Sequence, residues 1–385
     1  MYVYIIMLLL SLFFIMLAEK SNSNKIKNIL TILSAIPFIL VSALRYDVGT
    51  DYFYRYVPDY NSIVNGGNVD NLEIGFKLLI NLCILITKDY QILFIVTSII
   101  TITLFMYTIQ KQSKNKALSI TIFLLGGFFF QSLNILRQYM AIAIVFFSYR
   151  YLLKSKYPIF IVSVVLAFFI HNASIVCLIM LLLKDREILN FKTILIVALI
   201  IFIFGTPLIN LFKSIAQNTR FNVYIDSLYD RGDMRKLTIL SNLIIYIFMY
   251  LQYIVKRKNN TVIKEDIFYI NMQGATLIFI MLSSKFYLFF RIAYYFMIYQ
   301  IVSIPYFIKT IDTEQLYQYY FKDIMKDTMK LNNSVIKKIP IILNIFIILY
   351  FSIILSYTNI LNNDEEVLPY KTVINNEREN VIKND

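Results

Sequence analysis

Long runs of apolar residues recur along the whole chain and are separated by short polar connections. About 20 apolar residues cross a bilayer as a helix, and lipid leaves an isolated segment no other way to satisfy its backbone hydrogen bonds. We therefore predict an all-α polytopic membrane protein. The apolar segments cover residues 2–18, 26–44, 72–87, 90–110, 117–133, 135–153, 157–183, 191–209, 237–255, 266–283, 286–308 and 339–358.

Two of these segments fit a single crossing poorly. The run 72–87 is interrupted by Glu73 and Lys77, so we predict an interfacial or re-entrant helix. The run 157–183 is long for one crossing, and a hairpin that turns near His171 keeps the basic cluster after residue 255 on the cytoplasmic side. About ten full crossings remain. The alternative makes both segments single crossings, which exposes two lysine clusters on the outside and is less favoured by the charge rule.

Lysine-rich connections set the predicted orientation, because basic loops are retained in the cytoplasm. They follow the first helix and recur near residues 111–116, 150–156 and 256–264. The prediction is one transmembrane domain, 1–358, with both termini outside. Its polar parts are external loops 45–71 and 210–236, a cytoplasmic loop 309–338 and an external tail 359–385.

The composition agrees with this class. Hydrophobic residues make up 58% of the 385 residues and charged residues only 16%, and the mean hydropathy is +0.65, whereas soluble chains carry about 25% charged residues. The net charge of +13 is then a topology signal rather than a sign of nucleic-acid binding. Cys83 and Cys177 lie in apolar runs, so they indicate packing, and we expect no metal or cofactor. The first run is read as a retained helix rather than a signal peptide.

The arginines do not follow the lysines. In the predicted topology most of the eleven arginines are external, and Arg45, Arg137 and Arg291 lie at the outer ends of apolar helices. Guanidinium groups bind phosphate or carboxylate oxygens with two parallel bonds, so an external anionic ligand would explain this bias. The alternative for each residue alone is snorkelling to lipid headgroups.

A short polar segment follows the second helix. Leu44–Tyr56 reads LRYDVGTDYFYRY, and Gly49 allows a turn that would bring Asp51 back beside Arg45. An Arg–Asp pair that merely closes the loop is one interpretation. The other is a ligand site, in which tyrosine rings stack on sugars and Asp51 accepts hydroxyl hydrogen bonds, with Glu73 as a further carboxylate.

His171, the only histidine, lies in an apolar run. A lone buried histidine is commonly a packing residue, although ionisable groups at membrane depth are functional candidates and imidazole accepts protons near neutral pH. The external loop 210–236 carries Arg231 and Arg235 among charges of both signs. A solvated loop and a ligand site both remain open there.

Several short motifs together resemble the EpsG family, which is similar to Wzy-type polysaccharide polymerases. The resemblance runs from Arg45 to Tyr370. Its elements are RYDVGTDYFYRY at Arg45–Tyr56, Glu73-Ile74-Gly75-Phe76, the LRQ-x-x-A element at Leu136–Ala141, HNAS at His171–Ser174, R-x-x-x-YF at Arg291–Phe296, and Pro369-Tyr370.

The resemblance implies a glycosyltransferase of the bacterial plasma membrane that joins oligosaccharide repeat units carried on undecaprenyl pyrophosphate into exopolysaccharide or capsule at the outer face. Expected partners are that lipid-linked oligosaccharide, the bilayer and other membrane proteins of polysaccharide synthesis. The alternatives are a flippase for the same lipid-linked saccharide and a membrane acyltransferase that modifies surface polysaccharide.

Roles can be assigned to residues within this hypothesis. Arg45, Arg137 and Arg291 would bind the pyrophosphate and stabilise the charge that develops as it departs. Asp51, or secondly His171, would accept the proton of the attacking hydroxyl. Further candidates for substrate binding are Tyr52, Tyr56, Glu73, Gln138, Arg231, Arg235 and Tyr295.

Overall fold

The computed structural model describes residues 1–70, 72–217, 225, 236–313, 315, 319 and 339–374. The regular elements of this part of the chain are all helices, and it contains one isolated bridge between extended residues but no strand, so the prediction of an all-α polytopic membrane protein is confirmed. The chain divides into two compact units. One contains 1–148, 162–175 and the described part of 344–385, and the other contains 149–161 and the described part of 176–343.

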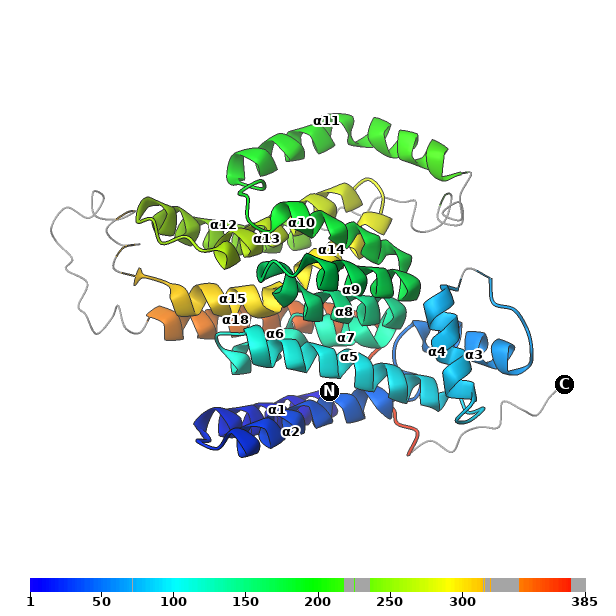
Figure 1. The fold of residues 1–385 in the computed structure, drawn as a ribbon. Helices are drawn as coiled ribbons and strands as arrows, with labels where there is room; N and C mark the ends of the chain where they lie inside the picture. The colour runs from blue at the N-terminus through cyan, green and yellow to red at the C-terminus, as the bar shows by residue number, and fades with distance from the viewer. Residues whose placement is uncertain are drawn as a thin grey trace. The chain divides into compact units, whose positions relative to one another are not determined.

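The first unit begins with α1 (Tyr2–Lys20) and α2 (Asn24–Ala43), which lie side by side (Figure 1). Ser11 donates to the Ser34 carbonyl between them, at 2.7 Å. The rest of this unit contains short and long helices in turn. They are η1 (Tyr52–Tyr56), α3 (Val57–Val64), α4 (Ile74–Ile84), α5 (Gln91–Gln112), α6 (Lys116–Leu125), α7 (Phe128–Asn134), most of α8 (Leu136–Leu153), most of α9 (Tyr157–Ile170) and, near the C-terminus, most of α18 (Ile339–Leu355) and η5 (Ser356–Leu361).

The second unit is built around α13 (Lys264–Ser283), which packs against α11 (Phe191–Ala216), α12 (Lys236–Lys258) and α14 (Leu288–Met297). Three amide side chains, Asn242, Gln273 and Gln300, bond to one another between its helices, with a Gln300 to Asn242 distance of 2.7 Å. Such hydrogen bonds hold helices together in lipid, where the hydrophobic effect does not drive helices to associate. It also contains α10 (Met180–Leu183) and α15 (Gln300–Thr310).

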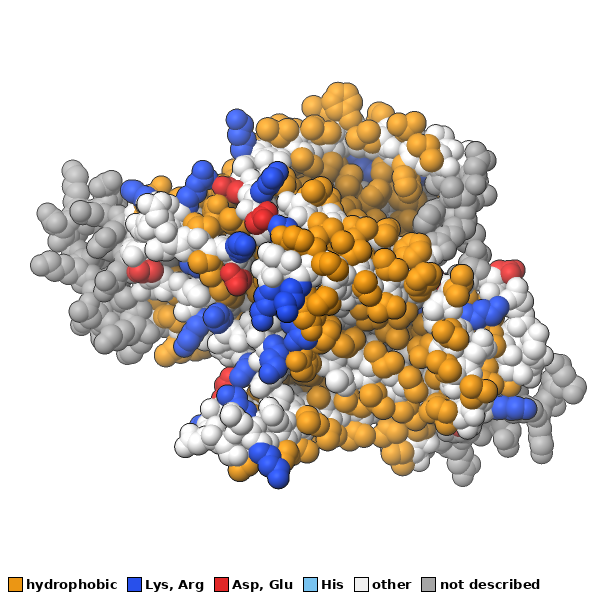
Figure 2. Space-filling view, in the orientation of Figure 1, with side chains coloured by type: hydrophobic (Ala, Val, Ile, Leu, Met, Phe, Trp, Pro, Cys, Tyr) orange, Lys and Arg blue, Asp and Glu red, His pale blue; other side chains and the backbone are white. Residues whose placement is uncertain are grey.

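Seven described helices are long and apolar enough to cross a membrane, and the number is nine if two bent pairs each count as one span. The pairs are α6 with α7, bent by 50° at Gly126–Gly127, and α14 with α15, bent by 42°. We predicted each of these pairs as a single apolar run, without the bend. Figure 2 shows hydrophobic side chains over much of the face that it draws, as expected for a surface in contact with lipid.

The helices found in the runs 72–87 and 157–183 explain why each run fits a single crossing poorly. The helix in 72–87 is α4, whose 11 residues reach about 16 Å and cannot cross a core of about 30 Å. The run 157–183 breaks at His171 into α9 (Tyr157–Ile170) and η2 (Asn172–Ile179), followed by α10. The Lys184 ammonium lies 4.9 Å from the ring centre of Tyr157, so the two ends of the run meet. It is a hairpin, as predicted.

The two ends of the first unit differ in chemistry. At one end, Lys116 pairs with Glu19 at 3.7 Å, so two of the lysine-rich connections lie together. At the other end, Tyr4 donates to the Val367 carbonyl at 2.9 Å, and residues of the tail run along the loop after α2. The N-terminus, the start of segment 45–71 and the tail thus share one end of the first unit, and that this end faces the outside stays a prediction.

Candidate functional site

An ion pair joins the starts of two helices in the first unit. Arg137 is the second residue of α8, and Glu73 is the residue that precedes α4. The Nη1 of Arg137 lies 2.5 Å from Oε2 of Glu73, and the side chains are only 13% and 11% exposed. The guanidinium also lies 5.9 Å from the ring centre of Phe76. A largely buried charge pair therefore sits where two helix N-termini meet.

More charged groups surround this pair. Burial raises the pKa of Tyr56, the Asp51 carboxylate raises it further, and Arg137 and Arg55 lower it. Burial also raises the pKa of Asp59, which Arg55 and Arg137 lower. Asp51 and Arg55 therefore lie within electrostatic reach of the Tyr56 hydroxyl, and Asp59 lies within electrostatic reach of Arg137. Arg55 and Asp59 form an ion pair of their own at 3.7 Å.

The tip of the membrane hairpin abuts the start of α4. A β-carbon on Gly75 would lie 2.7 Å from the Phe169 carbonyl oxygen, so glycine is required for this approach. Ile170 packs against the cluster that contains Tyr56 and Phe76. His171 follows directly and accepts a 3.3 Å hydrogen bond from the Ala173 amide at its Nδ1. The structure thus brings the HNAS element to the same end of the unit as Glu73.

Arg45 is fully buried among carbonyl groups and an aromatic ring. Its Nη1 donates to the Ser42 carbonyl at 3.0 Å and its Nη2 to the Leu133 carbonyl at 2.9 Å, while the guanidinium lies 4.7 Å from the centre of the Phe94 ring. It lines a polar cavity with about 10 Å³ of free space, roughly the room for one water molecule. Burial lowers the pKa of Arg45 to about 10, so it stays charged at neutral pH. Its interactions are those of a residue that caps the ends of α2 and α7, and pyrophosphate binding by Arg45 stays a prediction.

The chain turns at Gly49, as predicted from the sequence. Gly49 has a φ of +96°, a conformation that L side chains rarely adopt. The Asp51 amide then donates to Oδ1 of Asn134 at 3.0 Å, and Thr50 donates to the same oxygen. Arg45 and Asp51 thereby reach neighbouring residues at the end of α7.

The tail closes over this turn. Gln131 and Asn134 donate to the Glu365 carboxylate, and the Gly49 amide donates to the Glu366 carbonyl at 3.1 Å. The sequence reasoning missed Glu365 and Asn134, because no spacing links residues more than 200 positions apart. It also missed Asp59, whose place four residues after Arg55 on a short helix was an available signal.

The other residues predicted for the site lie at buried positions of the first unit, in the second unit, or outside the described residues. Tyr52 is buried, donates to Gln91 at 3.1 Å and stacks on Phe94, and Gln138 is buried as well. Arg291 is half-buried in α14, and Tyr295 on the same helix is buried; both belong to the second unit. Arg231 and Arg235 lie outside the described residues.

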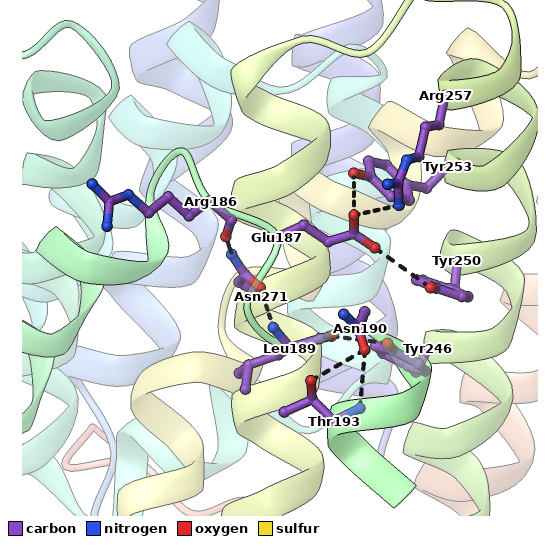
Figure 3. A network of polar contacts seen from close by, with 10 residues as sticks. All are labelled: Arg186, Glu187, Leu189, Asn190, Thr193, Tyr246, Tyr250, Tyr253, Arg257 and Asn271. Carbon is purple, nitrogen blue, oxygen red and sulfur yellow. Dashed lines mark hydrogen bonds and ion pairs between the residues drawn. The ribbon is translucent and has the colours of Figure 1, made fainter.

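The second unit has an extensive polar network of its own, shown in Figure 3. Its centre is the loop between α10 and α11. Glu187 accepts from Arg257 at 2.7 Å and from Tyr253 at 3.0 Å. Asn271 binds the loop backbone through three bonds, to the Leu183 and Arg186 carbonyls and from the Leu189 amide. This network fastens a connection that we predict to be cytoplasmic.

These observations define a class of protein. The described residues form a polytopic helical membrane protein with a charged, Tyr-rich end on its first unit. Within them no group of three or more His, Cys, Asp or Glu side chains is arranged to hold a metal ion.

The family model of the EpsG family matches residues 28–322, and the chain belongs to that family. EpsG is a Wzy-like polymerase family, so the resemblance noted in the sequence is confirmed, and the family suggests a polymerase related to exopolysaccharide. Neither the curated proteins nor the solved structures contain a match to this chain.

Proposed function

We propose that this protein is a glycosyltransferase that joins oligosaccharide repeat units carried on undecaprenyl pyrophosphate at the outer face of the bacterial plasma membrane. The observation that carries the proposal is the largely buried guanidinium of Arg137 at the junction of α4 and α8, next to a Tyr-rich segment. Family membership supplies the class of reaction.

The site suits a lipid-linked donor in three ways. Arginine binds diphosphate oxygens with planar, paired hydrogen bonds, and two helix N-termini add partial positive charge at the same point. The exposed apolar faces of the helices suit a polyprenyl chain. Segment 45–71, which also carries Tyr56, contains the exposed Tyr54 and the partly exposed Tyr46, and aromatic rings of this kind would pack against sugars.

The chemistry requires a charge-stabilising group and a proton acceptor. The hydroxyl oxygen of the acceptor sugar attacks the anomeric carbon of the donor, and the bond from that carbon to the pyrophosphate oxygen breaks. Arg137 stabilises the charge that develops on the departing pyrophosphate, a contribution of about a hundred- to a thousandfold in rate. Asp51 and His171 are the proton acceptors predicted from sequence.

A flippase for the same lipid is the second candidate, and an acyltransferase is the third. A transporter would require polar groups along the membrane depth. In the first unit, however, the charged cluster gathers at one end of the helices, around Arg137 and Glu73. This placement favours chemistry at a surface over passage across the membrane.

The test is Arg137→Ala in cells that depend on this protein for polymer. We expect polymer formation to fall at least a hundredfold and single lipid-linked repeat units to accumulate on the outer face, because the departing charge loses its partner. The measurement is the chain length of the polymer and the sidedness of the lipid-linked saccharide. Accumulation on the inner face would indicate a flippase instead, and full-length polymer that lacks acyl groups would indicate an acyltransferase.

Arg137→Lys is the matched variant, since lysine keeps the charge but loses the planar fork. We expect it to retain only a small part of the polymer length. Full restoration by lysine would contradict the claim that paired hydrogen bonds to the pyrophosphate are needed.

A further inference from the structure

Glu73 occupies the position where an anion would be bound. Within the described part of the chain, Arg137 is its only side-chain partner, and the pair lies at the N-termini of α4 and α8. Helix N-termini and guanidinium groups both favour anions. The carboxylate therefore takes the place that the donor pyrophosphate needs in the proposed function.

The two anions compete unequally for Arg137. A pyrophosphate carries more negative charge and more acceptor oxygens than a carboxylate, so it makes stronger paired bonds with guanidinium. The contact to be displaced is one hydrogen bond from Nη1 to Oε2, at 2.5 Å. Displacement of Glu73 would leave a carboxylate without its cation, directly beside the bound pyrophosphate.

We propose that Glu73 is the catalytic base of the glycosyl transfer and that Arg137 holds it inactive until the donor pyrophosphate replaces it. This inference rests on the proposed function. It deepens that function by assigning the proton acceptor and by coupling its release to the arrival of the donor.

The step balances as follows. The acceptor hydroxyl oxygen forms a bond to the anomeric carbon, and its proton passes to the released Glu73 carboxylate. The bond from the anomeric carbon to the pyrophosphate oxygen breaks, and the undecaprenyl pyrophosphate leaves with the electron pair and remains bound to Arg137. When it departs, Glu73 loses the proton to water and pairs with Arg137 again.

The surroundings favour Glu73 over the neighbouring acids. Asp59 is paired with Arg55 at 3.7 Å on the same short helical segment. Glu365 accepts bonds from two amide side chains, those of Gln131 and Asn134. Glu73 is the carboxylate bonded to the guanidinium that the donor would occupy, so its release and the binding of the donor are one event.

The test compares binding with turnover in Glu73→Gln. The probe for binding is radiolabelled undecaprenyl pyrophosphate, applied to the full chain in lipid nanodiscs, and turnover is the amount of polymer made in cells. Glutamine keeps an oxygen that accepts from Arg137 but no longer competes as an anion. We expect binding at least five times tighter and polymer formation at least a hundred times lower, since a general base contributes about a hundred- to ten-thousandfold.

A purely structural Glu73 gives a different pattern. It predicts that Glu73→Gln keeps polymer formation within about threefold of the unsubstituted chain, because the hydrogen bond to Arg137 survives. That result, or weaker binding of the probe, would overturn the inference. Asp51→Asn and His171→Gln test the rival bases: either one abolishing polymer while Glu73→Gln retains it also overturns the inference.

Two further variants separate this inference from the proposed function. Arg137→Ala should bind the probe at least tenfold more weakly, and unchanged binding there would refute the donor site itself. Asp47→Asn removes a carboxylate from an exposed ion pair with Lys371 on the same end of the unit. It should leave binding and polymer formation within about twofold, and tighter binding in this variant would show that any lost negative charge has the effect, which would also overturn the inference.

Discussion

Two arginine–glutamate contacts, one in each unit, are held in contrasting ways. Arg137 and Glu73 are largely buried and bonded to each other, without a further side-chain partner for Glu73 among the described residues. Glu187 accepts from Arg257 and also from two tyrosines, and its loop is bound to Asn271 through the backbone (Figure 3). Three side chains donate to Glu187, whereas Glu73 is held by a single hydrogen bond from Arg137.

The difference indicates different roles. A carboxylate with several fixed donors loses much if it moves, because buried partners are then left unsatisfied. A carboxylate that has one charged partner has only one contact to give up when another anion binds that partner. The network in the second unit therefore fixes a loop, whereas the pair in the first unit is suited to exchange with a ligand.

The largest effect is expected for Asn271→Asp, which tests whether Asn271 holds the loop between α10 and α11 in place. The new carboxylate keeps the acceptor for the Leu189 amide but loses both donors to the Leu183 and Arg186 carbonyls, at a fully buried position. We expect a loss of about 3 to 5 kcal/mol in the free energy of unfolding, measured by thermal unfolding in detergent.

Asn190→Asp is the matched control, because aspartate caps a helix as well as asparagine does. Asn190 accepts from the Thr193 amide at the start of α11, at 2.9 Å. Its substitution should change stability by less than about 0.5 kcal/mol. Equal effects of the two substitutions would contradict the fastening role of Asn271.

The next largest effect is expected for Gly75→Ala at the contact between α4 and the hairpin tip. The added methyl group would lie 2.7 Å from the Phe169 carbonyl oxygen, so the tip must move. Overpacking of this kind costs about 1 to 3 kcal/mol, and polymer formation should fall with it, because the tip abuts the residues around Glu73. Leu78→Ala, at an exposed position of the same helix, should leave polymer formation nearly unchanged, and an equal loss there would refute the close contact.

The smallest effect is expected for Arg257→Lys. The guanidinium is 65% exposed, and exposed ion pairs contribute about 1 kcal/mol or less. Tyr253 still donates to Glu187 in this variant. Stability in the same unfolding assay should change by less than about 1 kcal/mol, whereas Arg137→Lys should strongly reduce polymer. A large loss of stability from Arg257→Lys would remove the contrast between the two contacts.

The sequence predicted features that depend on short stretches of chain. Hydropathy and segment length predicted the helices, the short α4 and the break at His171, because the requirement for backbone hydrogen bonds in lipid acts on each segment separately. The same local reasoning missed the bends at Gly126–Gly127 and between α14 and α15, since a bent pair and a straight helix have the same composition.

The candidate site was only partly predictable for a related reason. Arg137 and Glu73 were selected as charged residues in apolar surroundings, and that signal is local. Arg45 was selected on the same signal, although its guanidinium turns inward to Ser42 and Leu133.

By itself, the sequence determined the class of protein, the family and the charged, Tyr-rich character of segment 45–71, because composition and motif order are properties of the linear chain. Only the tertiary structure decided which arginine meets a carboxylate and which is enclosed by carbonyl groups, and that the tail residue Glu365 closes over the turn at Gly49. These contacts join residues far apart in sequence, and they arise from the packing of whole helices, which no short stretch of sequence encodes.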